Sequence, residues 1–144
     1  MRRTMELCDS PPEGSILPKP PLISVIDDDA SFRVATDSLL RARGYTVHAF
    51  ESAADFLRSP ALDDTTCVIT DVKMPDISGL ALQTLLRSQG RTVPVIFITA
   101  FPEESARARA LRGGAVCFLS KASDAPTLLK YVEAALAVPP ATRR

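Results

Sequence analysis

The stretch Val68-Ile69-Thr70-Asp71-Val72-Lys73-Met74-Pro75-Asp76 decides the fold class of this chain. Its first residues are β-branched, as is typical of a buried strand, and the strand pattern reaches Asp71 before Pro75 breaks it. A strand that ends on an acid and runs into a turn is where an open α/β sheet places its functional groups. The stretch therefore predicts an α/β fold with Asp71 at the functional edge of the sheet.

Three other apolar stretches deliver polar groups to the same edge. They end on the acids Asp27-Asp28-Asp29, on the hydroxyl of Thr99 and on the ammonium group of Lys121. Clustered carboxylates repel one another unless a cation offsets their charge. Magnesium prefers oxygen ligands and often bridges carboxylates to phosphate. The pattern therefore predicts a site for a divalent cation and for a phosphoryl group on Asp71.

Strands and helices alternate along the rest of the chain. We expect strands at 22–26, 45–49, 67–71, 93–99 and 115–120, and helices at 29–43, 52–58, 79–89, 102–112 and 124–136. This alternation predicts a parallel sheet with helices on both faces. Each strand is apolar throughout, as a sheet covered on both sides requires.

Individual residues predict how the helices begin and what joins them. Asp29 or Ser31 can cap the first helix, and Ser123 or Asp124 the last. Pro102 is expected in the first turn of the fourth helix, where proline is well tolerated. Asp63 and Asp64 are expected in a polar loop.

Composition limits the organisation of the chain and its partners. The 144 residues are 46% apolar, which suits one domain at 22–138, with a flexible proline-rich arm at 1–21 and a tail at 139–144. The formal net charge is zero, and no apolar run is long enough to span a bilayer, so we expect no membrane partner. Three cysteines without paired spacing favour reduced thiols in the cytoplasm. The lone His48 and the absence of zinc-ligand spacings argue against a zinc site.

The motifs together resemble the receiver domains of two-component response regulators, within the CheY-like superfamily. The resemblance covers residues 22–138 and is carried by the runs 25–29, 70–79, 97–100 and 113–121. It is strongest to FixJ/NarL-like receivers, which share the Asp-x-x-Met-Pro-Asp-x-Ser-Gly run found here at 71–79. The resemblance implies a flavodoxin-like (βα)5 three-layer sandwich with sheet order 2-1-3-4-5.

The resemblance also assigns a role to each residue of the site. Asp71 matches the phosphoacceptor, and Thr99 and Lys121 match the groups that contact the phosphoryl oxygens. The implied Mg²⁺ ligands are Asp27, Asp28, Asp71 and the main-chain carbonyl of Lys73. Thr99 and Phe118 match the switch residues that repack after phosphorylation.

The implied function is that of a stand-alone phosphoaccepting receiver, a self-phosphorylating and self-dephosphorylating signalling domain rather than a turnover enzyme. Its donor would be a phosphohistidine of a sensor histidine kinase or of a histidine phosphotransferase. Signalling would proceed through a downstream protein bound at the 102–138 face, and the resemblance leaves open a phosphorylation-dependent homodimer. No helix-turn-helix pattern follows the receiver, so we expect no direct DNA binding.

Three alternatives compete with this interpretation. A degenerate receiver would act as a constitutive scaffold. An aspartyl-phosphate hydrolase would need an acid two residues after Asp71, where Lys73 stands. A nucleotide or flavin binder would need a phosphate loop after the first strand, where the acids stand.

One departure from the family pattern concerns Lys121, which precedes Ala122 where the family usually has proline. A cis bond before alanine costs ~3–4 kcal/mol. We therefore expect a trans bond and a shifted loop, which could move Lys121.

Overall fold

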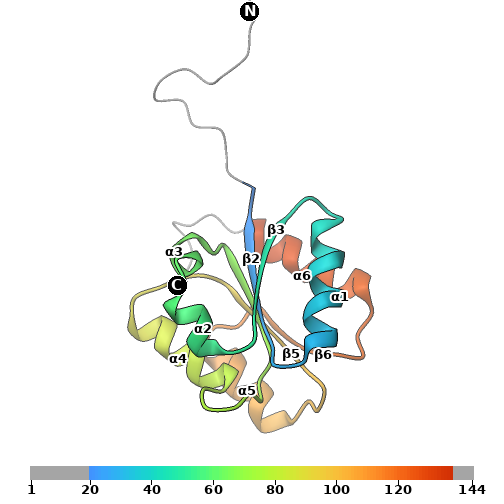
Figure 1. Cartoon of the computed structure of the whole chain (residues 1–144). Coiled ribbons are helices and arrows are strands. Elements are labelled where there is room, and N and C mark those ends of the chain that lie inside the picture. The colour runs from blue at the N-terminus through green and yellow to red at the C-terminus, as the bar shows by residue number, and fades with distance from the viewer. Residues whose placement is uncertain (1–19, 138–144) are drawn as a thin grey trace, which may run out of the picture.

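A five-stranded parallel sheet forms the centre of the protein (Figure 1). The computed structural model describes residues 20–137, so most of the predicted N-terminal arm and the whole C-terminal tail lie outside the described residues. The strands are β2 (Leu22–Ile26), β3 (Thr46–Phe50), β4 (Cys67–Thr70), β5 (Val95–Thr99) and β6 (Cys117–Ser120). Their spatial order is β3-β2-β4-β5-β6, with every neighbouring pair parallel, which confirms the predicted order 2-1-3-4-5.

Helices cover both faces of the sheet and complete three layers. They are α1 (Ala30–Arg41), α2 (Ala53–Arg58), α3 (Ala61–Asp64), α4 (Gly79–Ser88), α5 (Glu104–Arg112) and α6 (Ala125–Ala137). On one face, α1 and α6 pack on alternate strand residues such as Val25. On the other face, α2, α4 and α5 pack on the intervening residues such as Ile26 (Figure 1). Successive strand side chains point to opposite faces, so each helical layer packs on a different set of strand residues. The predicted α/β sandwich is thus confirmed.

The strands differ in how far they are buried. The side chains of β4 and β5 are buried throughout, as are those of β2 after Leu22. In β3, by contrast, Thr46, His48 and Ala49 are exposed. The expectation that every strand is covered on both faces is therefore wrong for β3, because this strand lies at the edge of the sheet.

Side-chain caps fix most of the helix starts. The Asp29 carboxylate accepts hydrogen bonds from the main-chain N–H groups of Ser31 and Phe32 at the start of α1. Asp124 accepts from the N–H of Thr127 at the start of α6. These two contacts decide between the alternatives that the sequence left open. Pro102, however, precedes a helix that begins at Glu104, so its expected place in the first turn is wrong.

The short helix α3 was not predicted. Asp63 and Asp64 form its last turn rather than a polar loop, and Asp63 pairs with Arg91 at 2.9 Å. A helix of four residues is too short to produce a helical repeat of apolar side chains, which explains why the sequence pattern missed it. None of the helices described is long and apolar enough to cross a bilayer.

Candidate functional site

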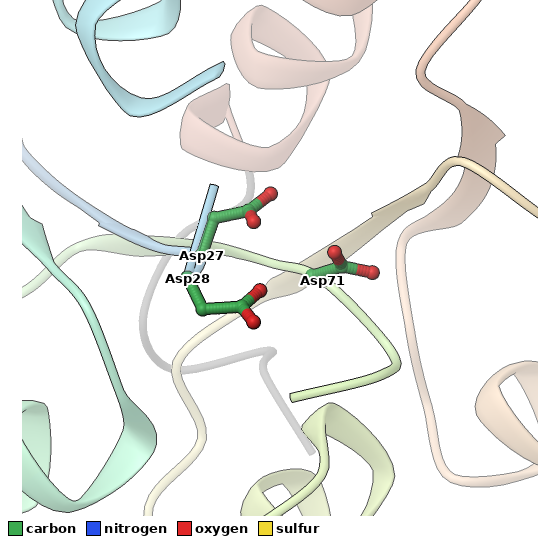
Figure 2. A group of neighbouring side chains, drawn as sticks. All are labelled: Asp27, Asp28 and Asp71. Atoms are coloured by element: carbon green, nitrogen blue, oxygen red, sulfur yellow. The ribbon is translucent and has the colours of Figure 1, made fainter. Parts of the chain in front are cut away.

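Three carboxylates converge at the carboxyl ends of β2 and β4. One oxygen from each of Asp27, Asp28 and Asp71 lies within 4.8 Å of the others (Figure 2). The sheet register produces this meeting, because Ile26 lies opposite Thr70 and the next residues leave both strands side by side. Asp27 and Asp71 are buried, whereas Asp28 is exposed. The predicted acidic cluster therefore has two enclosed members and one that faces solvent.

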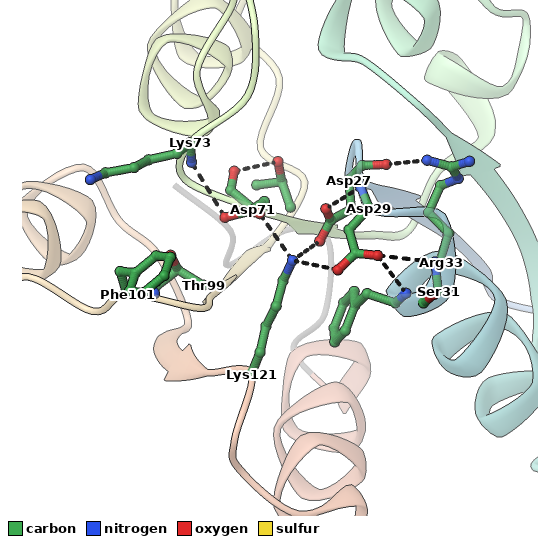
Figure 3. Close-up of polar contacts among 11 residues, drawn as sticks. Asp27, Asp29, Ser31, Arg33, Asp71, Lys73, Thr99, Phe101 and Lys121 are labelled. Carbon is green, nitrogen blue, oxygen red and sulfur yellow. Dashed lines mark hydrogen bonds and ion pairs between the residues drawn. The ribbon is translucent and has the colours of Figure 1, made fainter.

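Lys121 brings a positive charge into this cluster from the end of β6. Its Nζ lies 2.7 Å from Oδ2 of Asp27, 3.1 Å from Oδ2 of Asp71 and 3.9 Å from Oδ2 of Asp29 (Figure 3). The main-chain N–H of Lys121 donates to the carbonyl of Thr99 at 2.8 Å, which anchors the base of the side chain. The described residues contain no cis peptide bond, so the trans bond before Ala122 is confirmed. The ammonium group of Lys121 lies among the acids, so the replacement of proline by Ala122 does not move it out of the site.

Burial and charge act in opposite directions on these groups. Burial raises the pKa of Asp27 above its usual 3.8, and the contact with Lys121 offsets only part of that effect. Burial alone would lower the pKa of Lys121, but its contacts with Asp27 and Asp71 outweigh burial and raise that pKa. The Lys121 side chain is therefore held as a cation at neutral pH.

One oxygen of the cluster lacks a well-directed partner. Oδ2 of Asp27 is buried and accepts no hydrogen bond of good geometry from the described residues, although the Lys121 ammonium lies 2.7 Å away. A buried carboxylate oxygen in this state suits a cation that takes oxygen ligands. The three carboxylates are thus a donor set of the kind that Mg²⁺ takes.

Lys73 divides its contacts between the acceptor and a neighbouring loop. Its main-chain N–H donates to Oδ1 of Asp71 at 3.3 Å, which orients that carboxylate. Its side chain points away to Glu103, with Nζ 3.4 Å from Oε2 (Figure 3). Both charged groups are more than half exposed, so this ion pair adds little stability.

The two expected switch residues lie on the neighbouring strands β5 and β6. Thr99 is buried at the end of β5, where its hydroxyl accepts from the main-chain N–H of Phe101 at 3.3 Å (Figure 3). Phe118 is half-buried on β6 and lies against Phe97, with ring centroids 6.2 Å apart. Thr99 therefore lies at the functional edge but is hydrogen-bonded within its own loop.

The sequence-based analysis brought Asp29 to this edge without its contact to Lys121, and it gave no role in the site to three further residues, Phe32, Arg33 and Gly79. Asp29 lies near Lys121 as well as capping α1, Phe32 lies under the Lys121 ammonium, and Arg33 Nη1 donates to the carbonyl of Asp27 at 2.7 Å. Gly79 packs directly against the main chain of Asp71. A glycine at the first position of a helix is a signal of close backbone approach that could have revealed this last contact.

Comparison with known proteins places the chain in a family. The family model described as "Response regulator receiver domain" matches residues 23–133. This chain belongs to the response regulator receiver domain family. Receivers of this family are signalling domains of two-component systems, so the sequence-based recognition is confirmed.

Relatives of the receiver are regulators from several bacteria. The chain is 41% identical over 114 residues to "Nodulation protein W" of Bradyrhizobium diazoefficiens, an alignment that covers 79% of this chain and 50% of that protein. It is 40% identical over 116 residues to "Transcriptional regulatory protein TdiR" of Thauera aromatica, covering 81% of this chain and 51% of the relative. The solved structure of response regulator StyR superposes with a TM-score of 0.76 at 35% identity, covering 82% of this chain and 60% of StyR. FixJ-N superposes with a TM-score of 0.74 at 27% identity, covering 82% and 94% of the two chains.

These relatives overturn one sequence-based prediction. The expectation of output only through a protein bound at the 102–138 face, without direct DNA binding, relied on the absence of a further motif in the chain. The chain spans about half the length of the curated relatives TdiR and TodT, with 51% and 54% of them covered. A further relative, 33% identical with 24% of its length covered, is named "DNA-binding transcriptional regulator NtrC". The prediction of no direct DNA binding is therefore wrong, because the absence of a DNA-binding motif beside the receiver does not support it.

Proposed function

We propose that this receiver accepts a phosphoryl group on Asp71 from a phosphohistidine of a sensor histidine kinase or histidine phosphotransferase. The proposal is supported above all by one arrangement: three carboxylates lie within 4.8 Å of one another, and the ammonium of Lys121 lies 3.1 Å from Asp71. A lysine so placed can stabilise negative charge at the acceptor, which is most of what phosphoryl transfer requires.

The proposed transfer is a displacement at phosphorus. A carboxylate oxygen of Asp71 attacks, the new O–P bond forms, and the P–N bond to the histidine breaks. The imidazole nitrogen keeps the bonding electron pair and takes up a proton. Lys121 offsets the repulsion between carboxylate and phosphate, and the Thr99 hydroxyl can donate to a phosphoryl oxygen because its recorded hydrogen bond uses only the oxygen as acceptor.

Magnesium is part of the proposal. Asp27, Asp28, Asp71 and the main-chain carbonyl of Lys73 would hold it, and the buried Oδ2 of Asp27 supports this choice. When bound, the ion supplies positive charge that further offsets the repulsion between the acceptor and the phosphoryl group.

The signalling role extends the same proposal. Phosphorylation would draw the Thr99 hydroxyl toward Asp71 and change how Phe118 packs, because the two residues lie on adjacent strands. The receiver, at residues 22–138, would then act as a cytoplasmic signalling domain rather than a turnover enzyme. The names of TdiR and NtrC support regulation of transcription as the output that this receiver controls.

Intact-mass analysis after incubation with acetyl phosphate and Mg²⁺ tests the proposal. We expect one added phosphoryl group on the wild-type chain and none on Asp71→Asn. Asp76→Asn is the matched control, because Asp76 lies in the following turn at φ 69°, a conformation that asparagine also tolerates, and it should still be phosphorylated. No adduct on the wild type would favour a constitutive scaffold, and rapid turnover of unrelated phosphate esters would favour a hydrolase. Either result would refute the proposal.

A further inference from the structure

The Lys121 ammonium lies over an aromatic ring as well as among acids. Its Nζ is 4.7 Å from the centroid of the Phe32 ring, within the distance at which a cation is attracted to a ring face. The Lys121 side chain is only 15% exposed, so water screens this attraction weakly. Phe32 therefore supplies a fourth contact to the same ammonium that touches Asp27, Asp71 and Asp29.

The start of α1 holds the Phe32 ring in place. Phe32 lies in the first turn, where its main-chain N–H donates to Oδ1 of Asp29 at 3.3 Å. Its side chain is half-buried against the core layer of α1 and α6. The helix cap and the core together fix the ring beside Lys121.

A cavity next to this contact gives Lys121 an alternative position. The cavity lies between α1 and α6, has a volume of about 420 Å³, and is lined by Phe32, Lys121, Ile98 and Leu128 among others. A lysine has a long flexible side chain, and the Ala122 that follows it does not restrain the chain as proline would. The attraction of the ring opposes movement of the ammonium away from Asp71 into this space.

A neutral ring can attract the Lys121 ammonium without competing with Asp71 for it. A fourth carboxylate at this place would compete with Asp71 for the cation, whereas the ring face carries only a partial negative charge. We propose that Phe32 is a positioning residue that keeps the Lys121 ammonium at Asp71 during phosphorylation. This inference depends on the proposed function of Asp71 as the acceptor.

Graded fluorination of the ring separates its charge from its shape. Phe32 is replaced in turn by mono-, di- and trifluorophenylalanine, which weaken the negative face of the ring with little change in volume. We expect the rate of phosphorylation by acetyl phosphate and Mg²⁺ to fall stepwise, reaching a loss of about two- to thirtyfold. Phe32→Leu, which keeps an apolar side chain but has no ring, should show a loss of similar size while its thermal unfolding remains cooperative.

The same series at Phe56 is the matched control. Phe56 is fully buried on the opposite face of the sheet, where it contacts the ring of Phe50 at 5.4 Å. Fluorination there should leave the phosphorylation rate unchanged. A flat series at Phe32 with a phosphorylated wild type would overturn the role of Phe32 alone, whereas a wild type that takes no phosphoryl group would overturn the proposed function of the site.

A measurement without Mg²⁺ or a phosphodonor tests the contact itself. Thermal unfolding of Phe32→Leu, Lys121→Met and the double variant forms a double-mutant cycle. We expect the shift of the midpoint in the double variant to be smaller than the sum of the two single shifts, because each single variant already removes the shared contact. Additive shifts would overturn the inference.

Discussion

Replacing Gly79 with alanine would push the start of α4 away from the peptide that carries Asp71. A Cβ atom at this position would lie 3.0 Å from the carbonyl carbon of Asp71 and 3.1 Å from Cε1 of Phe97, and it would overlap the carbonyl oxygen of Asp71. None of these neighbours can swing aside, because two are main-chain atoms and the third belongs to a fully buried ring. The helix and the acceptor peptide must therefore separate by roughly 1 Å to restore ordinary contact.

This separation should cost both stability and reactivity. Overpacking of this kind costs about 1–3 kcal/mol, against which the higher helix propensity of alanine returns at most about 1 kcal/mol. The shift also displaces Asp71 from Lys121, and a misplacement of about 1 Å can slow a reaction about 100-fold. We expect Gly79→Ala to lower the urea midpoint by up to about 1–2 M and to slow phosphorylation by acetyl phosphate by one to two orders of magnitude.

Gly44→Ala is the matched control for this experiment. Gly44 has φ 89° and nothing within 4 Å of its would-be Cβ, so alanine there strains the main chain without displacing a neighbour. We expect Gly44→Ala to lose stability but to keep the wild-type rate of phosphorylation. If Gly79→Ala is as stable and as reactive as the wild type, the close packing of α4 on the acceptor peptide does not constrain the site.

Three further outcomes follow from the buried polar groups. Asp27→Asn should raise the thermal midpoint of the metal-free protein and abolish stabilisation by Mg²⁺, because burial raises the pKa of Asp27 and so penalises its charged form. The gain in thermal midpoint should be absent below pH 3.8, grow as the pH rises and level off above the raised pKa of Asp27. A gain that does not change with pH in differential scanning calorimetry would contradict this prediction. Burial raises the pKa of the Cys117 thiol to about 12. In a Cys8→Ser variant, a thiol reagent at pH 8 should therefore label Cys117 only as fast as the protein unfolds. Faster labelling would show an accessible thiolate. Gln83→Met should lower the free energy of unfolding in urea by about 1–3 kcal/mol, because the Ala110 carbonyl loses the side-chain amide that donates to it at 2.9 Å. An unchanged midpoint would show that another donor replaces that amide.

The sequence predicts the meeting of Asp27, Asp71 and Lys121 because a simple rule governs it. Parallel strands end at one edge of the sheet, so any residue that follows a strand is brought to that edge. The contact of Phe32 with Lys121 obeys no such rule, since it depends on where the first turn of α1 lies relative to the residue that follows β6. The same reason applies to Gly79, whose contact with Asp71 depends on the approach of a helix to a loop.

Edges and ends of elements were the other source of error. An apolar pattern in β3 predicts a strand but not its place at the border of the sheet, which leaves His48 in solvent. Proline is typical of a first helical turn, yet the chain after Pro102 remains extended at Glu103 before α5 begins. In both cases the local sequence permits two outcomes, and tertiary packing selects one.

The carboxylate of Asp29 connects the chemistry of the site to the secondary structure beside it. One of its oxygens caps α1, a helix of 12 residues, while the other lies 3.9 Å from the Lys121 ammonium. A redistribution of charge around that ammonium is therefore felt by the capped amides of Ser31 and Phe32, whose NMR resonances become a natural spectroscopic readout of the state of the acceptor.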